Sequence, residues 1–350
     1  STSVSANGKG AGNNSNDGNN AFVDSEGNLI TFYSQLRDTC YNICFKFSDK
    51  LFHYEFYLWF ISQGIGEKLL DIDTPYILEF LESYSTKDLE MAKLLWIYQS
   101  RRQNYFAAAQ ILYELSISDF EVDLVNRIQF LSRANGFCNC SCPPGLQQDM
   151  ILLQQQVYDL MMVANVQDEL LLLILSDERI SDIAKQKAID ELNGEVLTIS
   201  DLYNDYIEPL GYYELSLITF KVSDYRNSED ILSEWEAVFN KWFYEYIKNQ
   251  EVINKDSVTN EPFYSTLTNK FVILGSRLND TETLFPISEL FDLLAKYMYD
   301  EEYNGPGAKP ESVGLIIDTF IKSGISYSKL YYTLKDKIEC TTFEKYEGYS

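Results

Sequence analysis

The stretch from Leu94 to Phe137 places most of its apolar residues at the spacing of an α-helix. Three apolar stripes follow one another along the chain: Met91, Leu94, Leu95 and Tyr98; then Tyr105, Ala108, Leu112 and Leu115; then Leu124, Ile128 and Leu131, with Val125 beside them. This spacing puts the apolar side chains on one side of a helix with about 3.6 residues per turn. The stretch therefore predicts three short amphipathic helices joined by tight links.

Two local signals set the expected limits of the third helix. Ser118 and Glu121 form a capping-box pattern, in which each side chain bonds an otherwise unpaired backbone N–H. Gly136 stands where a helix C-terminus needs a residue that tolerates positive φ. A helix with one apolar face must pack on a neighbour, and short links make that neighbour the next helix. Because no fixed-period repeat occurs, the predicted fold is all-α, an irregular α-solenoid of stacked antiparallel helices.

The charge balance argues against two kinds of partner. The chain has 350 residues, of which 28 are Lys or Arg and 53 are Asp or Glu, so its formal net charge is −25. Such a chain repels phosphate backbones and anionic lipid headgroups. The pair Arg101–Arg102 is too small a basic patch to reverse this. No direct binding of nucleic acid is expected.

Cysteine usage and hydropathy place the chain in a reducing compartment without a membrane span. The six cysteines are too sparse for a disulfide scaffold at this length: Cys40, Cys44, Cys138, Cys140, Cys142 and Cys340. The first twenty residues are polar and contain no signal peptide. The longest aliphatic run, Leu170–Leu175, is far shorter than the roughly 20 residues of a membrane span. Since the chain begins with Ser, we expect it to be a fragment or a processed product.

Composition also predicts the domain organisation. Residues 1–24 are expected to be a disordered Gly/Asn/Ser-rich linker, and residues 25–345 a C-terminal α-solenoid domain. Phe32, Leu36, Cys40 and Ile43 recur at the spacing of an apolar helix face. Thr74–Pro75 is expected to start a helix with Thr74 at its cap. Pro262, Pro286 and Pro310 are expected in the first turns of later helices, and a surface turn is expected at residues 305–307. Apolar spacing, prolines and glycine turns predict further helices near residues 32–43, 51–61, 74–84, 146–176, 182–192, 200–206, 209–220, 228–249, 311–323 and 326–338. Only residues 271–274 have a brief strand-like composition.

Six runs resemble segments of one protein family, in the same order. They are Asn104–Ala109, Leu112–Leu115, the run from Ser118–Phe120 through Leu131–Phe137, Tyr206–Gly211, Leu284–Pro286 and Leu290–Tyr297. Together they resemble the inner-ring scaffold nucleoporins of the nuclear pore complex, the non-repetitive type built from a β-propeller followed by an α-solenoid. The resemblance lies in packing residues and includes no catalytic signature, so no partner-contact residue is carried over.

The resemblance implies an architectural protein of the nuclear envelope. It implies the C-terminal solenoid segment of a nuclear pore scaffold without enzymatic activity, in which the absent propeller half faces the membrane. The partners implied are linker peptides of other nucleoporins and the adjoining solenoid, in support of protein and mRNA transport. Membrane contact is not expected from this segment. A vesicle-coat or tethering α-solenoid has the same architecture and is the first alternative.

The thiols Cys138, Cys140 and Cys142 are the strongest candidate for a metal site. A structural zinc site needs four ligands, and only three are local here, although Cys40, Cys44 or Cys340 can complete the set. The spacing is not C-x2-C. Ordinary packing of the thiols is therefore preferred. The pair Cys40 and Cys44, four residues apart on one helix, is also assigned to packing rather than to redox chemistry.

The acidic clusters support a second alternative, an all-α metal-dependent enzyme. Asp71 with Asp73, and residues 300–302, carry carboxylates of the kind that bind Mg²⁺. A D-D-x-x-D motif and a phosphate-binding loop are both absent. His53 is assigned to packing, as are the aromatic stripes at residues 52–60 and 235–246, whose outer faces can form a partner groove. No catalytic, cofactor-binding or metal-binding residue is predicted, and no cofactor.

Overall fold

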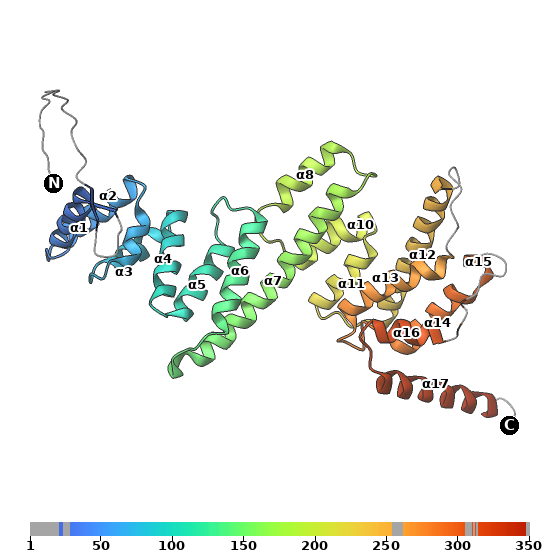
Figure 1. Cartoon of the computed structure of the whole chain (residues 1–350). Coiled ribbons are helices and arrows are strands. Elements are labelled where there is room, and N and C mark those ends of the chain that lie inside the picture. Colours follow the sequence, from blue (N-terminus) through green and yellow to red (C-terminus); the bar gives the residue numbers. More distant parts are fainter. Residues whose placement is uncertain are drawn as a thin grey trace, which may run out of the picture. The chain divides into compact units, whose positions relative to one another are not determined.

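The computed structural model describes residues 21–23, 29–253, 262–304, 310, 312 and 314–347 (Figure 1). The described chain is helical apart from one short strand pair, which confirms the predicted all-α class. It divides into two compact units, residues 1–103 and 104–350. The linker and domain limits at residues 24 and 345 remain predictions, because residues 1–20 and most of the expected linker lie outside the described residues. The predicted turn at residues 305–307 lies outside them too.

The first unit contains the strand pair and four α-helices. Its elements are β1 (Ala21–Val23), β2 (Leu29–Thr31), α1 (Phe32–Cys44), α2 (Lys50–Ser62), the 3-10 helix η1 (Gly66–Asp71), α3 (Ile77–Ser85) and α4 (Leu89–Arg101). The strands pair antiparallel, with Phe22 opposite Ile30. The sequence analysis did not predict this pair, because strands of three residues are too short to show alternation.

The core of the first unit is aromatic. Tyr57, Phe60 and Phe80 are at most 1% exposed, and the ring of Tyr57 contacts that of Phe80 edge to face at 5.1 Å between centroids. His53 is buried among them, with Nδ1 3.1 Å from the Tyr57 hydroxyl and Nε2 2.7 Å from the Phe47 carbonyl oxygen. Both ring nitrogens are thus hydrogen-bonded within the core, which confirms the assignment of His53 to packing.

The expected helix start at Thr74–Pro75 is two residues too early. Helix α3 begins at Ile77, and Tyr76 is its N-cap. The Thr74 hydroxyl does not cap the helix but forms a hydrogen bond with the Tyr57 hydroxyl. The Thr74 side chain, which the local pattern assigned to capping, therefore makes a tertiary contact with α2 instead.

The second unit contains the remaining helices. Its elements are α5 (Tyr105–Ser116), α6 (Leu124–Cys138), the 3-10 helix η2 (Pro144–Leu146), α7 (Gln147–Ser176), α8 (Asp182–Leu192), α9 (Ile199–Leu202), the π-helical turn η3 (Tyr203–Ile207), α10 (Glu208–Leu210), α11 (Tyr213–Val222), α12 (Ser228–Ile253), α13 (Phe263–Leu278), α14 (Ile287–Tyr299), α15 (Glu301–Asn304), α16 (Gly314–Lys322) and α17 (Tyr327–Glu347). Helices α5, α6 and α7 pack side by side (Figure 1).

The link between α5 and α6 is held by a buried arginine that the sequence analysis missed. Arg127 is 2% exposed, and its guanidinium donates to four backbone carbonyls. Its Nη1 lies 2.9 Å from the Ser116 oxygen and 2.8 Å from that of Ser118. The Nε and Nη2 atoms reach the Val122 and Phe120 oxygens at 3.2 and 3.0 Å. Burial lowers the pKa of Arg127, and the carbonyl dipoles compensate for the lost hydration.

Both predicted limits of the third helix are wrong. Helix α6 is capped by Asp123, whose carboxylate accepts from the Asn126 N–H at 2.9 Å, and not by the box at Ser118. The Ser118 hydroxyl donates instead to the Leu115 carbonyl. Gly136 lies inside the helix, which continues to Cys138. The buried face of α6 also differs from the predicted one, because Val125, which was placed beside the apolar stripe, is 52% exposed.

A buried glutamine connects α7 to the loop after α8. Gln167 is fully buried, and its Nε2 donates to the carbonyls of Leu192 and Glu195 at 2.7 and 2.8 Å. Its Oε1 accepts from the Leu197 N–H at 2.7 Å. All three polar positions of this amide are thereby satisfied, which fixes the loop that leads into α9.

Helix α12 carries the aromatic core of the second unit. Trp235 and Phe239 are fully buried and Trp242 is 2% exposed, so the assignment of this stripe to the core is confirmed. The strand-like residues 271–274 lie inside α13, where Phe271 packs on the Trp235 ring at 5.7 Å between centroids. Pro262 and Pro286 are the N-caps of α13 and α14. Helix α16 begins only at Gly314, so Pro310 precedes the helix rather than lying in its first turn.

Candidate interaction surfaces

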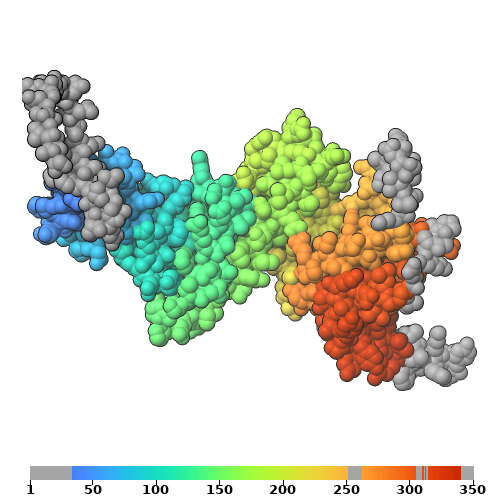
Figure 2. Space-filling view, viewed as in Figure 1, coloured from blue at the N-terminus to red at the C-terminus, as the bar shows by residue number. Residues whose placement is uncertain are grey.

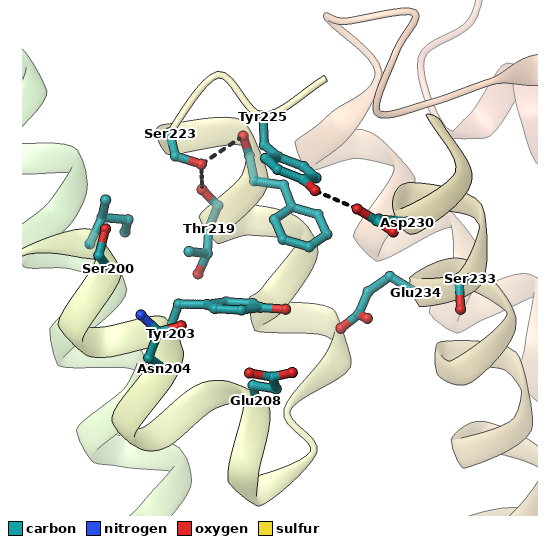
Figure 3. Close-up of a pocket in the computed structure, with 12 residues that line it drawn as sticks. Ser200, Tyr203, Asn204, Glu208, Thr219, Ser223, Tyr225, Asp230, Ser233 and Glu234 are labelled. Atoms are coloured by element: carbon teal, nitrogen blue, oxygen red, sulfur yellow. Dashed lines mark hydrogen bonds between the residues drawn. The ribbon is translucent and has the colours of Figure 1, made fainter. Parts of the chain in front are cut away.

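A pocket of about 540 Å³ lies in the second unit between α9, η3, α11 and α12 (Figure 3). Its lining residues are mostly polar or aromatic: Ile199, Ser200, Tyr203, Asn204, Glu208, Thr219, Phe220, Ser223, Tyr225, Asp230, Ser233 and Glu234. None of these described lining residues is Lys or Arg. The pocket is therefore acidic as well as aromatic.

The sequence around η3 explains how the pocket forms. Thr198 caps α9, since its hydroxyl accepts from the Asp201 N–H at 3.2 Å. The helix then widens into a π-helical turn that projects Tyr203 toward the pocket (Figure 3). Gly211, with φ of 69°, ends α10 in the left-handed region, so the predicted single helix at 209–220 is two helices. Turns of the π type occur frequently at functional sites.

Aromatic rings and carboxylates face one another across the pocket. The Phe220 ring lies between those of Tyr203 and Tyr225, with centroid distances of 5.6 and 4.8 Å. The hydroxyl end of Tyr203 and the carboxyl groups of Glu208 and Glu234 converge on the same region (Figure 3). A pocket built in this way offers ring faces and negative charge together.

The pocket disfavours the charged form of Glu234. Burial raises the pKa of Glu234, and the nearby Glu208 and Glu214 carboxylates raise it further. Burial also raises the pKa of Tyr203. A hydrogen bond from the Ser216 side chain lowers the pKa of Glu234 in part, but burial and the neighbouring negative charges outweigh it, so the ionised form is disfavoured overall.

We predict that replacing Glu234 by glutamine raises the melting temperature at neutral pH and changes it little below pH 4.5, the ordinary glutamate pKa. The folded state binds the Glu234 proton more tightly than the unfolded chain does. The wild-type chain thus loses stability as pH rises from 4.5 through the raised pKa. Circular dichroism melts at the two pH values measure the difference. Glu236→Gln, at an exposed position of the same helix, is the control, and an equal effect of both substitutions at both pH values would contradict the prediction.

A second, apolar surface lies on the last helices of the second unit. A groove of about 480 Å³ is lined by Ile317 of α16 and by α17 residues that include Tyr327, Leu330 and Leu334. Tyr327 and Tyr331 are 67% and 62% exposed. The surface of this segment, red in Figure 2, continues onto that of α13 and α14, in orange, and α16 and α17 both pack on α14. The groove therefore leaves apolar and aromatic side chains of α17 exposed.

The first unit exposes part of its expected apolar face. Leu36 and Ile43 of α1 are 49% and 53% exposed, although their spacing predicted burial. Tyr41 of α1 and Phe45, which directly follows the helix, face inward instead, and their rings pack on Phe60 at 5.0 and 6.2 Å between centroids. Aromatic packing with α2 has therefore set the rotation of this helix.

The thiol cluster is not assembled as a metal site in the described part of the chain. Cys138 is buried at the end of α6, while Cys140 is exposed and Cys142 half-buried in the following loop. Burial raises the pKa of Cys138 to about 11, which disfavours the thiolate that zinc requires.

The acidic clusters are engaged in structural contacts. Asp71 pairs with Arg101 at 2.6 Å, and Asp300 accepts from the Glu302 N–H at 3.0 Å. Within the described residues, no group of three or more His, Cys, Asp or Glu side chains is arranged to hold a metal ion. The described helices also include none that combines the length and apolar character needed to cross a bilayer.

Comparison with known proteins identifies the family. The model of the non-repetitive/WGA-negative nucleoporin C-terminal family matches residues 3–348. The chain belongs to this nucleoporin family. Nucleoporin NUP170 of Saccharomyces cerevisiae is 39% identical over 306 residues, which cover 87% of this chain and 20% of that protein. Nuclear pore complex protein Nup154 of Drosophila melanogaster is 27% identical over 255 residues, 70% of this chain and 17% of that protein.

Solved nucleoporin structures share the fold. The crystal structure of the Chaetomium thermophilum Nup170 CTD–Nup145N complex matches with a TM-score of 0.79 and 27% identity, over 88% of this chain and 59% of that chain. The structure of the Chaetomium thermophilum Nup170 CTD matches with a TM-score of 0.75. The predicted inner-ring scaffold family and α-solenoid fold are thus confirmed. This nucleoporin chain spans about a fifth of the length of the curated relatives it matches.

The sequence analysis missed the acidic–aromatic pocket of this nucleoporin. Its residues come from positions 199 to 234 and from several elements, so no local motif marks them. The one available signal was the family-like run Tyr206–Gly211, which contributes Glu208 to the pocket. Sequence reasoning assigned that run to packing alone.

Proposed function

We propose that this chain is a structural, non-enzymatic segment of the nuclear pore scaffold that binds extended linker segments of other nucleoporins. Family membership supports this role, since the matched relatives are nucleoporins. The observation that carries it is the match to a Nup170 C-terminal domain crystallised with Nup145N. Its place is the nuclear pore complex at the nuclear envelope, where it supports protein and mRNA transport.

The surface of the chain supports binding of more than one segment. The acidic pocket and the apolar groove on α17 are distinct surfaces of the same unit. A linker contacts such a scaffold through short anchors that enter preformed grooves. The adjoining solenoid is the second expected partner, and exposed apolar residues of α1 offer one contact for it.

A binding screen of the chain against peptides from other pore components tests the proposal. We expect at least one linker segment to bind with a micromolar or lower Kd, and its scrambled sequence to bind far more weakly. The scrambled control matters because a chain with net charge −25 attracts any basic peptide. Absence of sequence-dependent binding, together with a tagged full-length protein that stays away from the nuclear rim, would overturn the proposal.

A further inference from the structure

Helix α17 is attached to the rest of the second unit by few buried side chains. Among its described side chains, residues 327–339, only Leu330 is buried, at 2% exposure, and Leu334 is partly buried against the same core. Tyr331 and Ile338 are 62% and 65% exposed. By contrast, the nine-residue helix α16 buries three side chains. Apolar burial therefore contributes little to holding α17 in place.

The turn before α17 is anchored much more firmly than the helix itself. Ser323 is fully buried and Ile325 is 4% exposed. The Asn279 side-chain amide donates to the Ser323 carbonyl at 2.6 Å, and its nitrogen occupies the space that a side chain on Gly324 would need. Gly324 has a φ of 96°, which suits glycine. The chain is therefore fixed as far as Ile325, and a movement of α17 has to begin after that residue.

Two lysines connect α17 to α14 and to the loop before it. The Lys337 Nζ donates to the Ser288 carbonyl at 2.8 Å and to the Asp292 carboxylate. The Lys337 side chain is 27% exposed, so its ammonium gives up part of its hydration to make these contacts. Lys329 pairs with Glu282 at 3.1 Å, but the Glu282 side chain is 83% exposed, and such exposed pairs stabilise little. Lys337 therefore makes the stronger of the two connections.

The position of α17 decides whether the apolar groove exists. The groove lies between Ile317 of α16 and residues of α17 that include Leu330 and Leu334, so α17 forms most of its lining. Most of the stability of a helix in a protein comes from its tertiary packing. A released α17 would therefore lose helical structure as well as its place beside α16. The contact that holds α17 on α14 thereby also maintains the groove.

We propose that α17 is a releasable helix, which the contact of Lys337 with Ser288 and Asp292 holds in its docked state. Loss of this contact releases α17 beyond the fixed turn at Gly324 and Ile325 and removes the groove, while the rest of the second unit stays folded. Segments with few buried apolar contacts open at free energies below that of global unfolding. Salt screens ion contacts that solvent reaches, so release increases with ionic strength. The inference concerns the chain alone and does not depend on linker binding.

Hydrogen exchange of the whole chain, followed by mass spectrometry, tests the inference. In the wild-type chain we expect residues 327–338 to exchange faster than α13 and α14, and faster still when NaCl is raised from about 0.05 M to about 0.5 M. Lys337→Gln should raise the exchange rate of this segment about fivefold at the lower salt concentration. It should also remove most of the salt dependence of that rate, and leave exchange in α13 and α14 unchanged.

Two further variants assign the effect to the contact itself. Lys335→Gln is the matched control, because the partner of Lys335 is Glu339 of the same helix, at 3.7 Å, and it should change the exchange rate by no more than about twofold. Asp292→Asn should act like Lys337→Gln, and the double variant should open little more than either single variant, because both remove the same contact. Equal exchange in Lys337→Gln and Lys335→Gln, or α13 and α14 opening together with α17, overturns the inference.

Limited digestion with trypsin gives a second measurement of release. Cleavage after Lys329 requires local unfolding of α17 next to Leu330, which lines the groove. We expect Lys337→Gln to be cleaved there faster than Lys335→Gln, and the wild-type chain to be cleaved faster as salt rises, relative to an unstructured peptide of the same sequence. Equal cleavage rates of the two variants would count against release of α17.

Discussion

Replacement of Arg127 by methionine is expected to lower the free energy of unfolding of the second unit by about 3 kcal/mol. The buried guanidinium donates to the carbonyls of Ser116, Ser118, Phe120 and Val122. Methionine keeps much of the volume but donates nothing, so the carbonyls at the end of α5 and in the link lose their partners. Urea denaturation gives the change in free energy, and hydrogen exchange of residues 104–138 should show it locally.

Two further variants separate hydrogen bonding from charge. Arg226→Met removes an exposed arginine, 73% exposed at its side chain, and should change stability by no more than about 0.5 kcal/mol. Arg127→Lys keeps the charge but not the planar fork, and we expect an intermediate loss, since an ammonium cannot reach four carbonyls in the same directions. If Arg127→Met proves as stable as Arg226→Met, the buried guanidinium does not hold the link.

Replacement of Trp235 by alanine should cost the second unit about 4 kcal/mol. The indole is fully buried and packs on Phe271 and Phe285 at 5.7 and 5.9 Å between ring centroids. Its Nε1 also donates to the Leu284 carbonyl at 2.9 Å. Truncation leaves a large cavity between α12, α13 and α14 as well as an unpaired carbonyl. Denaturant midpoints measured by circular dichroism give the size of the loss.

The same helix supplies the control for this prediction. Tyr244→Ala removes an aromatic ring that is 71% exposed, and it should change stability by no more than about 0.5 kcal/mol. Trp235→Phe retains most of the ring contacts but not the N–H, and should lie between the two. If the Trp235→Ala and Tyr244→Ala chains unfold at the same denaturant midpoint, the aromatic cluster around Trp235 does not stabilise the core.

Long apolar patterns predicted the helices well. The range 182–192 agrees with α8 at both ends, and the range 146–176 differs from α7 only in its first residue. In both, many turns of consistent spacing outweigh any single local signal. Short signals did worse. The Ser118 box and the Gly136 terminus were both wrong, because the Arg127 contacts and the Asp123 cap decide that region.

The pocket was beyond reach of sequence reasoning for a different reason. Glu208 and Glu234 each look like solvated residues of an amphipathic helix, and only the π-helical turn and the break at Gly211 bring their elements together. Neither feature has a reliable sequence pattern. Buried polar groups such as Arg127 and Gln167 were hidden in the same way, since their partners are backbone atoms of loops. Apolar periodicity therefore predicted the positions of the helices. The polar contacts between the helices could be recognised only in the structure.

The length of α7 has a mechanical consequence. A continuous helix of 30 residues, at about 1.5 Å per residue, extends about 45 Å. It packs on α6 and also on α8 and α11, and its buried residues include Leu153 and Val157 in its first half. No loop interrupts the rod between these layers, so a load applied to one layer is carried to the other by axial stiffness. A continuous helix of this length therefore keeps the distance between the helices packed along it constant when the chain is under load.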